Sequence, residues 1–150
     1  MAFGLIRTLI DAWYAGARVA PPDRLVTRHS VSFTFTLPLA YEEQLLKIDG
    51  VSKVTYAAWF GGIYIDPKNF FANFAVDPAT YLDMYAEFIV PPEEMKAFLD
   101  DRRGAIVGRR LADRFGWKIG DNVPLIGTIY PGDWKFTIRG IYNGRDKDVD

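Results

Sequence analysis

Residues 105–125 read AIVGRRLADRFGWKIGDNVPL, and the order of local signals in this stretch decides the fold. The apolar run at 105–107 lies between two glycines and predicts a short strand. Apolar residues at helical spacing come next, and Gly116 then ends the predicted helix. Gly120-Asp121 predicts a turn into a further strand that begins at Val123. This one stretch therefore predicts a strand, a helix and a second strand in that order.

A hairpin is predicted directly after this stretch. The residue pattern indicates one strand over 123–130, a loop at Pro131-Gly132-Asp133 and a second strand that runs outward to Gly140. The apolar positions of the second strand are Trp134, Phe136 and Ile138. Their alternation slips at Gly140, which predicts a β-bulge. Residues 143–150 have no apolar periodicity, and we expect them to be frayed.

Upstream, residues 24–62 predict a β-α-β unit. Strict alternation over Arg24 to Leu37 predicts a half-buried strand, whose apolar face consists of Val31, Phe33, Phe35 and Leu37. A short amphipathic helix is predicted next, with Tyr41, Leu45 and Ile48 on one face and Gly50 at its end. A second strand is predicted over 51–60, where Gly61-Gly62 ends it.

The N-terminal segment, residues 1–20, predicts one helix with a broad apolar face. Pro21-Pro22 ends it because proline lacks a backbone donor and disfavours helix in the preceding residue. Three roles are open for this helix: part of the core, a stalk continuing from a membrane segment, or a surface for a partner.

The middle of the chain, residues 63–88, is rich in aromatic residues. A strand is predicted over 70–76. Asp77-Pro78 and Pro91-Pro92 each introduce a short helix, because proline is tolerated in the first turn and acidic residues are favourable there. Helices and strands thus follow one another without regular alternation, and the predicted fold class is α+β.

Composition excludes several classes of function. The chain has 150 residues with 49% hydrophobic and 25% charged residues, which is typical of one folded domain. Its net charge of −1 disfavours nucleic-acid binding, and its lack of cysteine excludes thiol catalysis and disulfides. No apolar run has the length of about 20 residues that a membrane helix needs, and no signal peptide is visible.

No catalytic, cofactor-binding or metal-binding residue is predicted. The single histidine, His29, has no second histidine or cysteine to act with, and no glycine pattern matches a nucleotide-binding fingerprint. The acidic pairs are Glu42/Glu43, Glu93/Glu94 and Asp100/Asp101; adjacent residues on a helix do not face one another. We expect Arg102-Arg103 and Arg109-Arg110 to be neutralised by the neighbouring Asp100, Asp101 and Asp113.

Three motifs resemble the periplasmic core domain of MacB/FtsX-type ABC transporter permeases. Residues 105–125 resemble that family's strand, Leu-Ala helix, Gly, Gly-Asp and strand signature. Residues 136–142, FTIRGIY, and residues 48–55, IDGVSKVT, are similar to two further elements of the family, in the same order. An aromatic block over 59–81 resembles one branch of these permeases, and the whole resemblance covers roughly residues 24–142.

The resemblance implies a noncatalytic periplasmic domain that couples movement of membrane helices to export or extraction of a substrate. It implies a helix at 1–21 that continues from the first membrane helix, a porter-like β-α-β half at 22–62, a Sabre-like α/β subdomain at 63–142 and a tail at 143–150. The parent protein would lie in the inner membrane, with this domain on the periplasmic side. Its partners would be an ABC ATPase, a second permease copy, and a periplasmic adaptor or a lipoprotein, peptide or lipid substrate.

Two sets of residues are candidates for contact within such a domain. Ile10, Trp13 and Tyr14 belong to the predicted lever helix. The candidate partner or substrate surface consists of Trp59, Phe60, Tyr64, Phe70 and Phe71, although these rings could equally form the core.

A second porter half is expected to lie beyond this sequence. The strand over Arg24 to Leu37, or its neighbour, should therefore have an unpaired edge that is prone to pair with another copy. Two other functions stay open: a small soluble hydrolase using paired carboxylates, and a stand-alone binding module.

Overall fold

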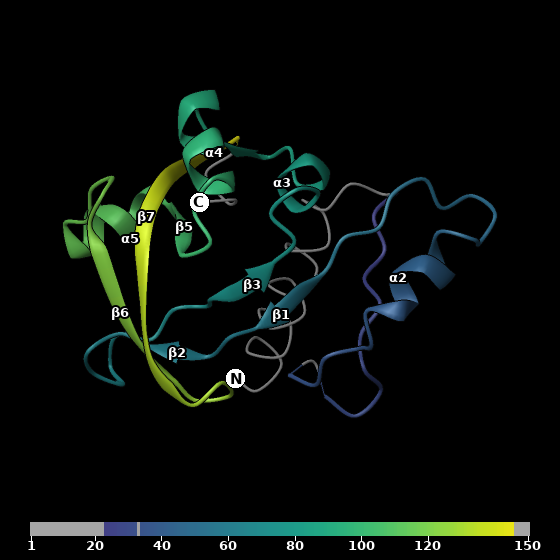
Figure 1. Cartoon of the computed structure of the whole chain (residues 1–150), viewed down its shortest axis with the longest axis horizontal. Helices are drawn as coiled ribbons and strands as arrows, with labels where there is room; N and C mark the ends of the chain where they lie inside the picture. Colours follow the sequence, from purple (N-terminus) through teal and green to yellow (C-terminus); the bar gives the residue numbers. More distant parts are fainter. Residues whose placement is uncertain (1–22, 33, 146–150) are drawn as a thin grey trace, which may run out of the picture.

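The computed structural model describes residues 23–32 and 34–145, and the helix predicted over residues 1–20 lies outside them. The fold is α+β, as the sequence predicts (Figure 1). Its helices are α2 (Ala40–Leu45), α3 (Tyr81–Met84), α4 (Pro92–Leu99) and α5 (Arg109–Phe115). Its strands are β1 (Ala57–Trp59), β2 (Gly62–Ile63), β3 (Phe74–Val76), β4 (Phe88–Ile89), β5 (Gly104–Gly108), β6 (Asn122–Gly127) and β7 (Gly132–Gly144).

The long strand β7 organises a five-stranded mixed sheet. β6 pairs with its first half in antiparallel register, and β2 pairs with the far edge of β6. β5 runs parallel to the second half of β7, and β4 pairs with its last two residues. Helices α4 and α5 pack against β5 and β7. β7 therefore contacts three other strands, β4, β5 and β6, and two helices, α4 and α5.

Residues 105–125, which we call the decisive stretch, fold as predicted. β5, α5 and β6 occur in the expected order, and Gly116 ends α5 in a left-handed conformation at φ 68°. Such a conformation is strained for residues other than glycine, which explains why the helix ends there. The predicted bulge is also confirmed: Ala105 pairs with Ile138 while Ile106 pairs with Gly140, so Arg139 is the extra residue in β7.

The core lies between this sheet and α5. Its buried residues are Phe60, Ala112, Trp117, Val123, Leu125, Ile138 and Ile141. Ile138, at the centre of β7, is fully buried, and burial of one such side chain contributes roughly 1.5–3 kcal/mol. Tyr64, Phe71 and Phe115 surround Trp117 with rings 4.8–5.8 Å away between centroids. The aromatic segment thus supplies core rings from outside the decisive stretch.

A two-stranded sheet of β1 and β3 lies beside the larger sheet. The Asn73 side chain joins the two sheets, because its carboxamide oxygen accepts the Gly62 N–H at 2.7 Å. Its amide nitrogen donates to the Gly62 carbonyl at 2.9 Å. One side chain therefore pairs with both backbone groups of a residue at the sheet edge, as a further strand would do.

The β-α-β unit predicted over 24–62 is wrong in its first strand, whereas its helix is present as α2 and part of its second strand as β1. Residues 23–32 and 34–37 contain no strand, and Val31 and Phe35 are 74% and 55% exposed. The Phe35 N–H instead donates to the Ser32 carbonyl, which closes a local turn. Alternation predicts which face of a strand is apolar, but a strand also needs a neighbour for its backbone groups, and none is adjacent here.

Other element bounds also differ from those predicted. The strand predicted over 51–60 is reduced to β1, which pairs with β3, and the strand predicted over 70–76 is reduced to β3. β6 ends at Gly127, and the hairpin turn occupies 128–131 rather than 131–133. Asn143 and Gly144 belong to β7 rather than to a frayed tail. The predicted domain boundary between residues 62 and 63 falls inside β2.

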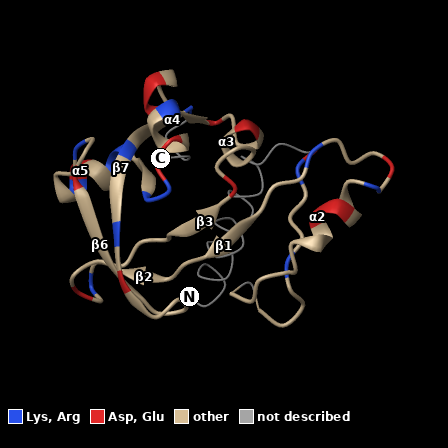
Figure 2. Ribbon diagram, in the orientation of Figure 1, with Lys and Arg blue, Asp and Glu red and all other residues tan. Residues whose placement is uncertain are grey.

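Charged residues are spread over the larger sheet and its helices, whereas exposed apolar side chains are frequent in the segment that carries α2. Figure 2 shows residues of both signs interspersed along α4, α5 and β7. The segment that carries α2 lies to one side of the larger sheet in Figure 1, and many of its apolar side chains are exposed. Leu25, for example, is 92% exposed. None of the described helices is long and apolar enough to cross a membrane.

Candidate functional site

The acidic pairs do not converge. Asp101 forms an ion pair with Arg139 at 2.8 Å, and Glu94 accepts the Ile141 N–H at 2.7 Å. Both carboxylates are therefore already bound to residues of β7. His29 accepts the Val31 N–H and contacts the Phe35 ring. Across residues 23–32 and 34–145, no group of three or more histidine or acidic residues is arranged to hold a metal ion.

Arg24 makes the contacts that stand out at the start of the described chain. Its guanidinium donates to the Glu87 carboxylate at 2.5 and 3.0 Å, and to the Met84 carbonyl at 2.7 Å. The guanidinium carbon also lies 4.1 Å from the centre of the Tyr85 ring. The paired side chains are only 13% and 19% exposed. Residues more than sixty positions apart in sequence are therefore joined by a bidentate ion pair and a cation–π contact.

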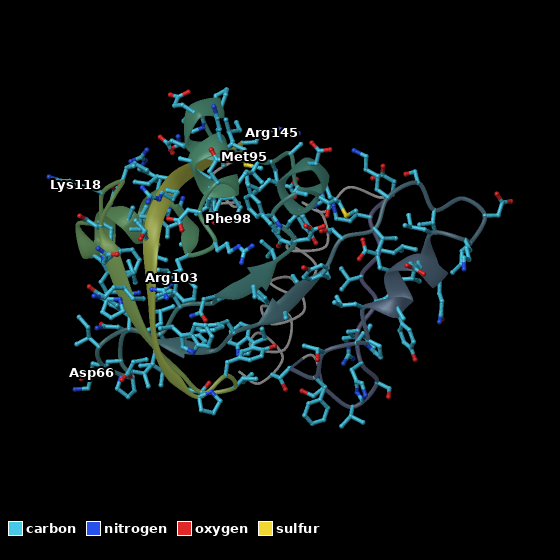
Figure 3. All side chains as sticks on the ribbon, viewed as in Figure 1. Asp66, Met95, Phe98, Arg103, Lys118 and Arg145 are labelled. Atoms are coloured by element: carbon cyan, nitrogen blue, oxygen red, sulfur yellow. The ribbon has the colours of Figure 1, made fainter. Side chains whose placement is uncertain are left out.

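The other end of the described chain reaches the same place. The Arg145 N–H donates to the Glu87 carbonyl at 2.9 Å, and its guanidinium donates to the Ala86 carbonyl at 3.1 Å. Figure 3 shows Arg145 near the α4 end of the molecule. We call Arg24, Met84, Tyr85, Glu87 and Arg145 the end junction, because both ends of the described chain bind to one another through it.

Electrostatics favour the charged form of both partners in the end junction. The hydrogen bond from Arg24 lowers the pKa of Glu87, and the same bond raises the pKa of Arg24. Burial among neighbouring rings raises the pKa of Tyr81 to about 12. The rings of Tyr81, Tyr85, Phe88 and Tyr142 follow one another with centroids 4.4–5.9 Å apart. The ion pair thus lies beside a continuous row of rings.

The predicted aromatic surface divides between core and surface. Phe60 is 7% exposed and belongs to the core, and Tyr64 and Phe71 pack against that core. Trp59 and Phe70 lie 6.2 Å apart between ring centroids, and Phe70 is 65% exposed. The Phe74 ring meets Trp59 edge-on, with ring centroids 5.1 Å apart. We call Trp59, Phe70 and Phe74 the aromatic face.

The remaining candidates have different outcomes. Ile10, Trp13 and Tyr14 lie outside the described residues. Asp101 forms its ion pair with Arg139 rather than with Arg102 or Arg103, so the expected neutralisation of these arginines is not seen as a direct ion pair with Asp101. Hydrogen bonds from the Arg103 backbone N–H and from Arg139 lower the pKa of Asp101 and keep it ionised. Arg109 donates to Asn143 rather than to an acidic residue.

Sequence reasoning missed the end junction. Arg24 was placed only at the start of a strand, and Glu87 was given no role. Their contact depends on where the chain places α3 and β4 relative to Arg24. A sequence pattern over a few residues cannot predict a contact between residues so far apart. The one available signal is a charged residue among apolar neighbours, as Glu87 is between Ala86 and Phe88.

Comparisons with known proteins leave the family open. No family model matches the chain, and neither curated proteins nor solved structures gave a significant match. The motifs in residues 48–55, 105–125 and 136–142 therefore carry the permease resemblance.

Proposed function

We propose that this chain is a noncatalytic extracytoplasmic domain of a MacB/FtsX-type ABC transporter permease. Its parent protein lies in the inner membrane, acts with an ABC ATPase and a second permease copy, and handles a lipid, peptide or lipoprotein substrate or an adaptor on the periplasmic side. The proposal starts from three sequence motifs in the order that the family has.

The end junction is the structural observation that carries the proposal. A domain joined to a moving membrane helix needs a contact through which that movement reaches its sheet. Arg24 follows the predicted lever helix in sequence and binds Glu87, and Arg145, directly after β7, binds Ala86 and Glu87. The ion pair between Arg24 and Glu87 is largely buried.

The same contacts offer a route for mechanical coupling. The segment that carries Ile10, Trp13 and Tyr14 leads directly into Arg24. Arg24 binds Glu87, which adjoins β4, and β4 pairs with the end of β7. Movement of the predicted lever helix would therefore act on the central strand of the larger sheet. Coupling of this kind requires an element that both sites can bias.

Purification of the intact gene product tests the proposal. An affinity tag inserted at the exposed turn at 66–69 avoids the core. We expect the tagged protein in the membrane fraction, and we expect detergent-solubilised material to contain an ABC ATPase subunit or domain. A tagged protein that stays in the soluble fraction without any ATPase contradicts the proposal.

A second test separates coupling from folding. In the intact transporter, Ile10→Ser and Trp13→Ser should abolish export while the far-UV circular dichroism of the isolated chain stays unchanged. Export at the wild-type rate in both variants would mean that this helix is not a lever.

A further inference from the structure

A half-open depression of about 380 Å³ lies between the turn before β5 and the first half of β7. Its charged lining residues are Arg102, Arg103, Asp133 and Lys135, and its rings are Trp134 and Phe136. Figure 3 shows Arg103 beside β7. Three cationic side chains thus share the depression with one carboxylate and two aromatic rings.

The cationic groups are available to a ligand. None of Arg102, Arg103 and Lys135 makes an ion pair with another described residue. Asp101, the acidic neighbour expected to neutralise the arginines, is held by Arg139 at 2.8 Å. The lining therefore carries an excess of two positive charges, which is a local property in a chain whose net charge is −1.

The backbone that carries these groups is fixed by hydrogen bonds. The Arg103 carbonyl accepts the Thr137 N–H at 2.8 Å, which extends the β5–β7 pairing by one residue. The Arg103 N–H donates to the Asp101 carboxylate at 2.9 Å, and the Gly104 N–H donates to the Asp101 carbonyl. The Arg139 bond to Asp101 therefore supports the turn from which the arginines project.

The aromatic rings that line the depression pack against a core residue. Trp134 and Phe136 are nearly parallel, and both contact the buried Phe60 ring edge-on at 5.7 and 5.5 Å. Tyr130 on the hairpin stacks on the same Phe60 ring at 5.7 Å and is itself 37% exposed. Cationic groups beside an exposed apolar surface match a molecule that is anionic at one end and apolar at the other.

We propose that this depression binds the phosphate group of an amphiphilic molecule. Guanidinium groups bind phosphate oxygens with two parallel hydrogen bonds, and Lys135 adds a point charge. The apolar part of the ligand would cover Trp134 and the hairpin. The inference does not rest on the permease proposal, since every residue in it lies within the described chain and binding can be measured without a transporter.

Binding assays with the 150-residue chain test this site. The probes are inorganic phosphate and monomeric dioctanoyl phosphatidylglycerol, measured by calorimetry, with dioctanoyl phosphatidylcholine as the lipid of zero net charge. We expect phosphatidylglycerol to bind most tightly and to weaken as salt increases. Arg102→Gln with Arg103→Gln should weaken that binding by about tenfold or more, because each substitution removes a charged hydrogen-bond donor.

A matched control removes the same net charge elsewhere. Lys68→Gln with Lys118→Gln changes two exposed lysines outside the depression, and Figure 3 shows Lys118 at the edge of the molecule, away from Arg103. We expect this variant to bind phosphatidylglycerol within about twofold of the wild type, since a specific site depends on its own lining cations rather than on net charge. An equal loss in both double variants would overturn the site.

Three further outcomes are decisive. Inorganic phosphate binding as tightly as phosphatidylglycerol would overturn the proposal, because the apolar part of the ligand would then add nothing to binding. Phosphatidylcholine binding as tightly would also overturn it, because the net negative charge would then add nothing. Absence of binding by every probe, in a chain whose circular dichroism and thermal unfolding are normal, would also overturn it. Arg102 and Arg103 are both exposed, so their substitution should leave thermal unfolding unchanged.

Discussion

Two ion pairs in this chain differ in burial, and that difference determines their expected contribution to stability. Arg24 and Glu87 are 13% and 19% exposed, and Arg24 also contacts Met84 and the Tyr85 ring. Lys53 and Asp83 lie 3.0 Å apart but are 63% and 72% exposed. Solvent screens the exposed pair, and such pairs contribute at most about 1 kcal/mol.

Glu87→Gln should therefore destabilise the chain by about 2 kcal/mol at neutral pH, because it leaves the low-exposure Arg24 without its charged partner. Urea unfolding followed by circular dichroism measures this change in the free energy of unfolding. Asp83→Asn is the control and should change it by less than about 0.5 kcal/mol. Equal effects of the two substitutions would mean that the end junction adds no stability.

The contribution of Glu87 should also depend on pH. Its pKa is lower in the folded chain, so the folded state binds this proton less tightly than the unfolded state does. The stabilisation is therefore fully present above the ordinary glutamate pKa of about 4.3 and is lost as the pH falls through the lower, folded-state value.

Unfolding measurements from pH 7 to pH 2.5 should show the wild type and Glu87→Gln becoming similar in stability at the acidic end. A difference between them that stays constant over the whole range would show that the carboxylate charge is not what stabilises the junction.

At the scale of elements, the sequence correctly predicted those features that depend on interactions between residues close in sequence. The order of β5, α5 and β6, the αL end at Gly116 and the bulge before Gly140 all follow from residues close in sequence. The strand predicted over Arg24 to Leu37 failed because its pairing depends on a partner that local alternation cannot supply. The turn at 128–131 was misplaced because Pro131 and Gly132 looked like its centre, whereas Gly132 begins β7.

Gly127, the last residue of β6, lies where a side chain does not fit. A Cβ on Gly127 would lie 1.9 Å from the Tyr130 carbonyl oxygen, the same atom that accepts the Trp134 indole N–H at 3.0 Å. Gly127→Ala should therefore open the turn and cost about 2 kcal/mol or more. Gly116→Ala is the control, since a Cβ there meets no atom within 4 Å and only the αL conformation is strained, at about 1 kcal/mol.

Thermal unfolding of the two variants measures this difference. We expect the Gly127→Ala variant to have the lower Tm. The packing argument fails if Gly116→Ala has the greater effect.

At the scale of the whole molecule, the two halves of the described chain differ in how their backbone is protected. Backbone–backbone hydrogen bonds in residues 34–51 join positions only three or four apart, and many apolar side chains there are exposed. β6 and β7 instead pair along their length around the buried Ile138. Amide exchange is slow where opening must break many cooperative contacts.

Hydrogen exchange followed by mass spectrometry should therefore find peptides from 34–51 exchanged within seconds, while peptides from β6 and β7 stay protected by at least about a thousandfold more. Equal protection in both regions would mean that the α2 segment packs in solution against a surface that it does not touch in this fold.

Only part of the candidate site could be predicted from the sequence. Aromatic composition indicated a surface, but burial divided it, because Phe60 belongs to the core and Tyr64 and Phe71 pack against it, while Phe70 is 65% exposed. The end junction and the cationic depression both depend on long-range contacts, namely Arg24 with Glu87 and Arg139 with Asp101. From the sequence we expected Asp101 to neutralise Arg102 and Arg103. The excess positive charge in the depression was therefore not predicted.

Protease accessibility in spheroplasts tests the central claim most directly, namely that this chain works outside the cytoplasmic membrane. A specific cleavage site can be inserted at the 66–69 turn of the intact gene product, where Asp66 lies at the periphery in Figure 3. We predict cleavage by protease added to spheroplasts whose cytoplasmic marker protein remains intact. Cleavage that occurs only after lysis would contradict the account.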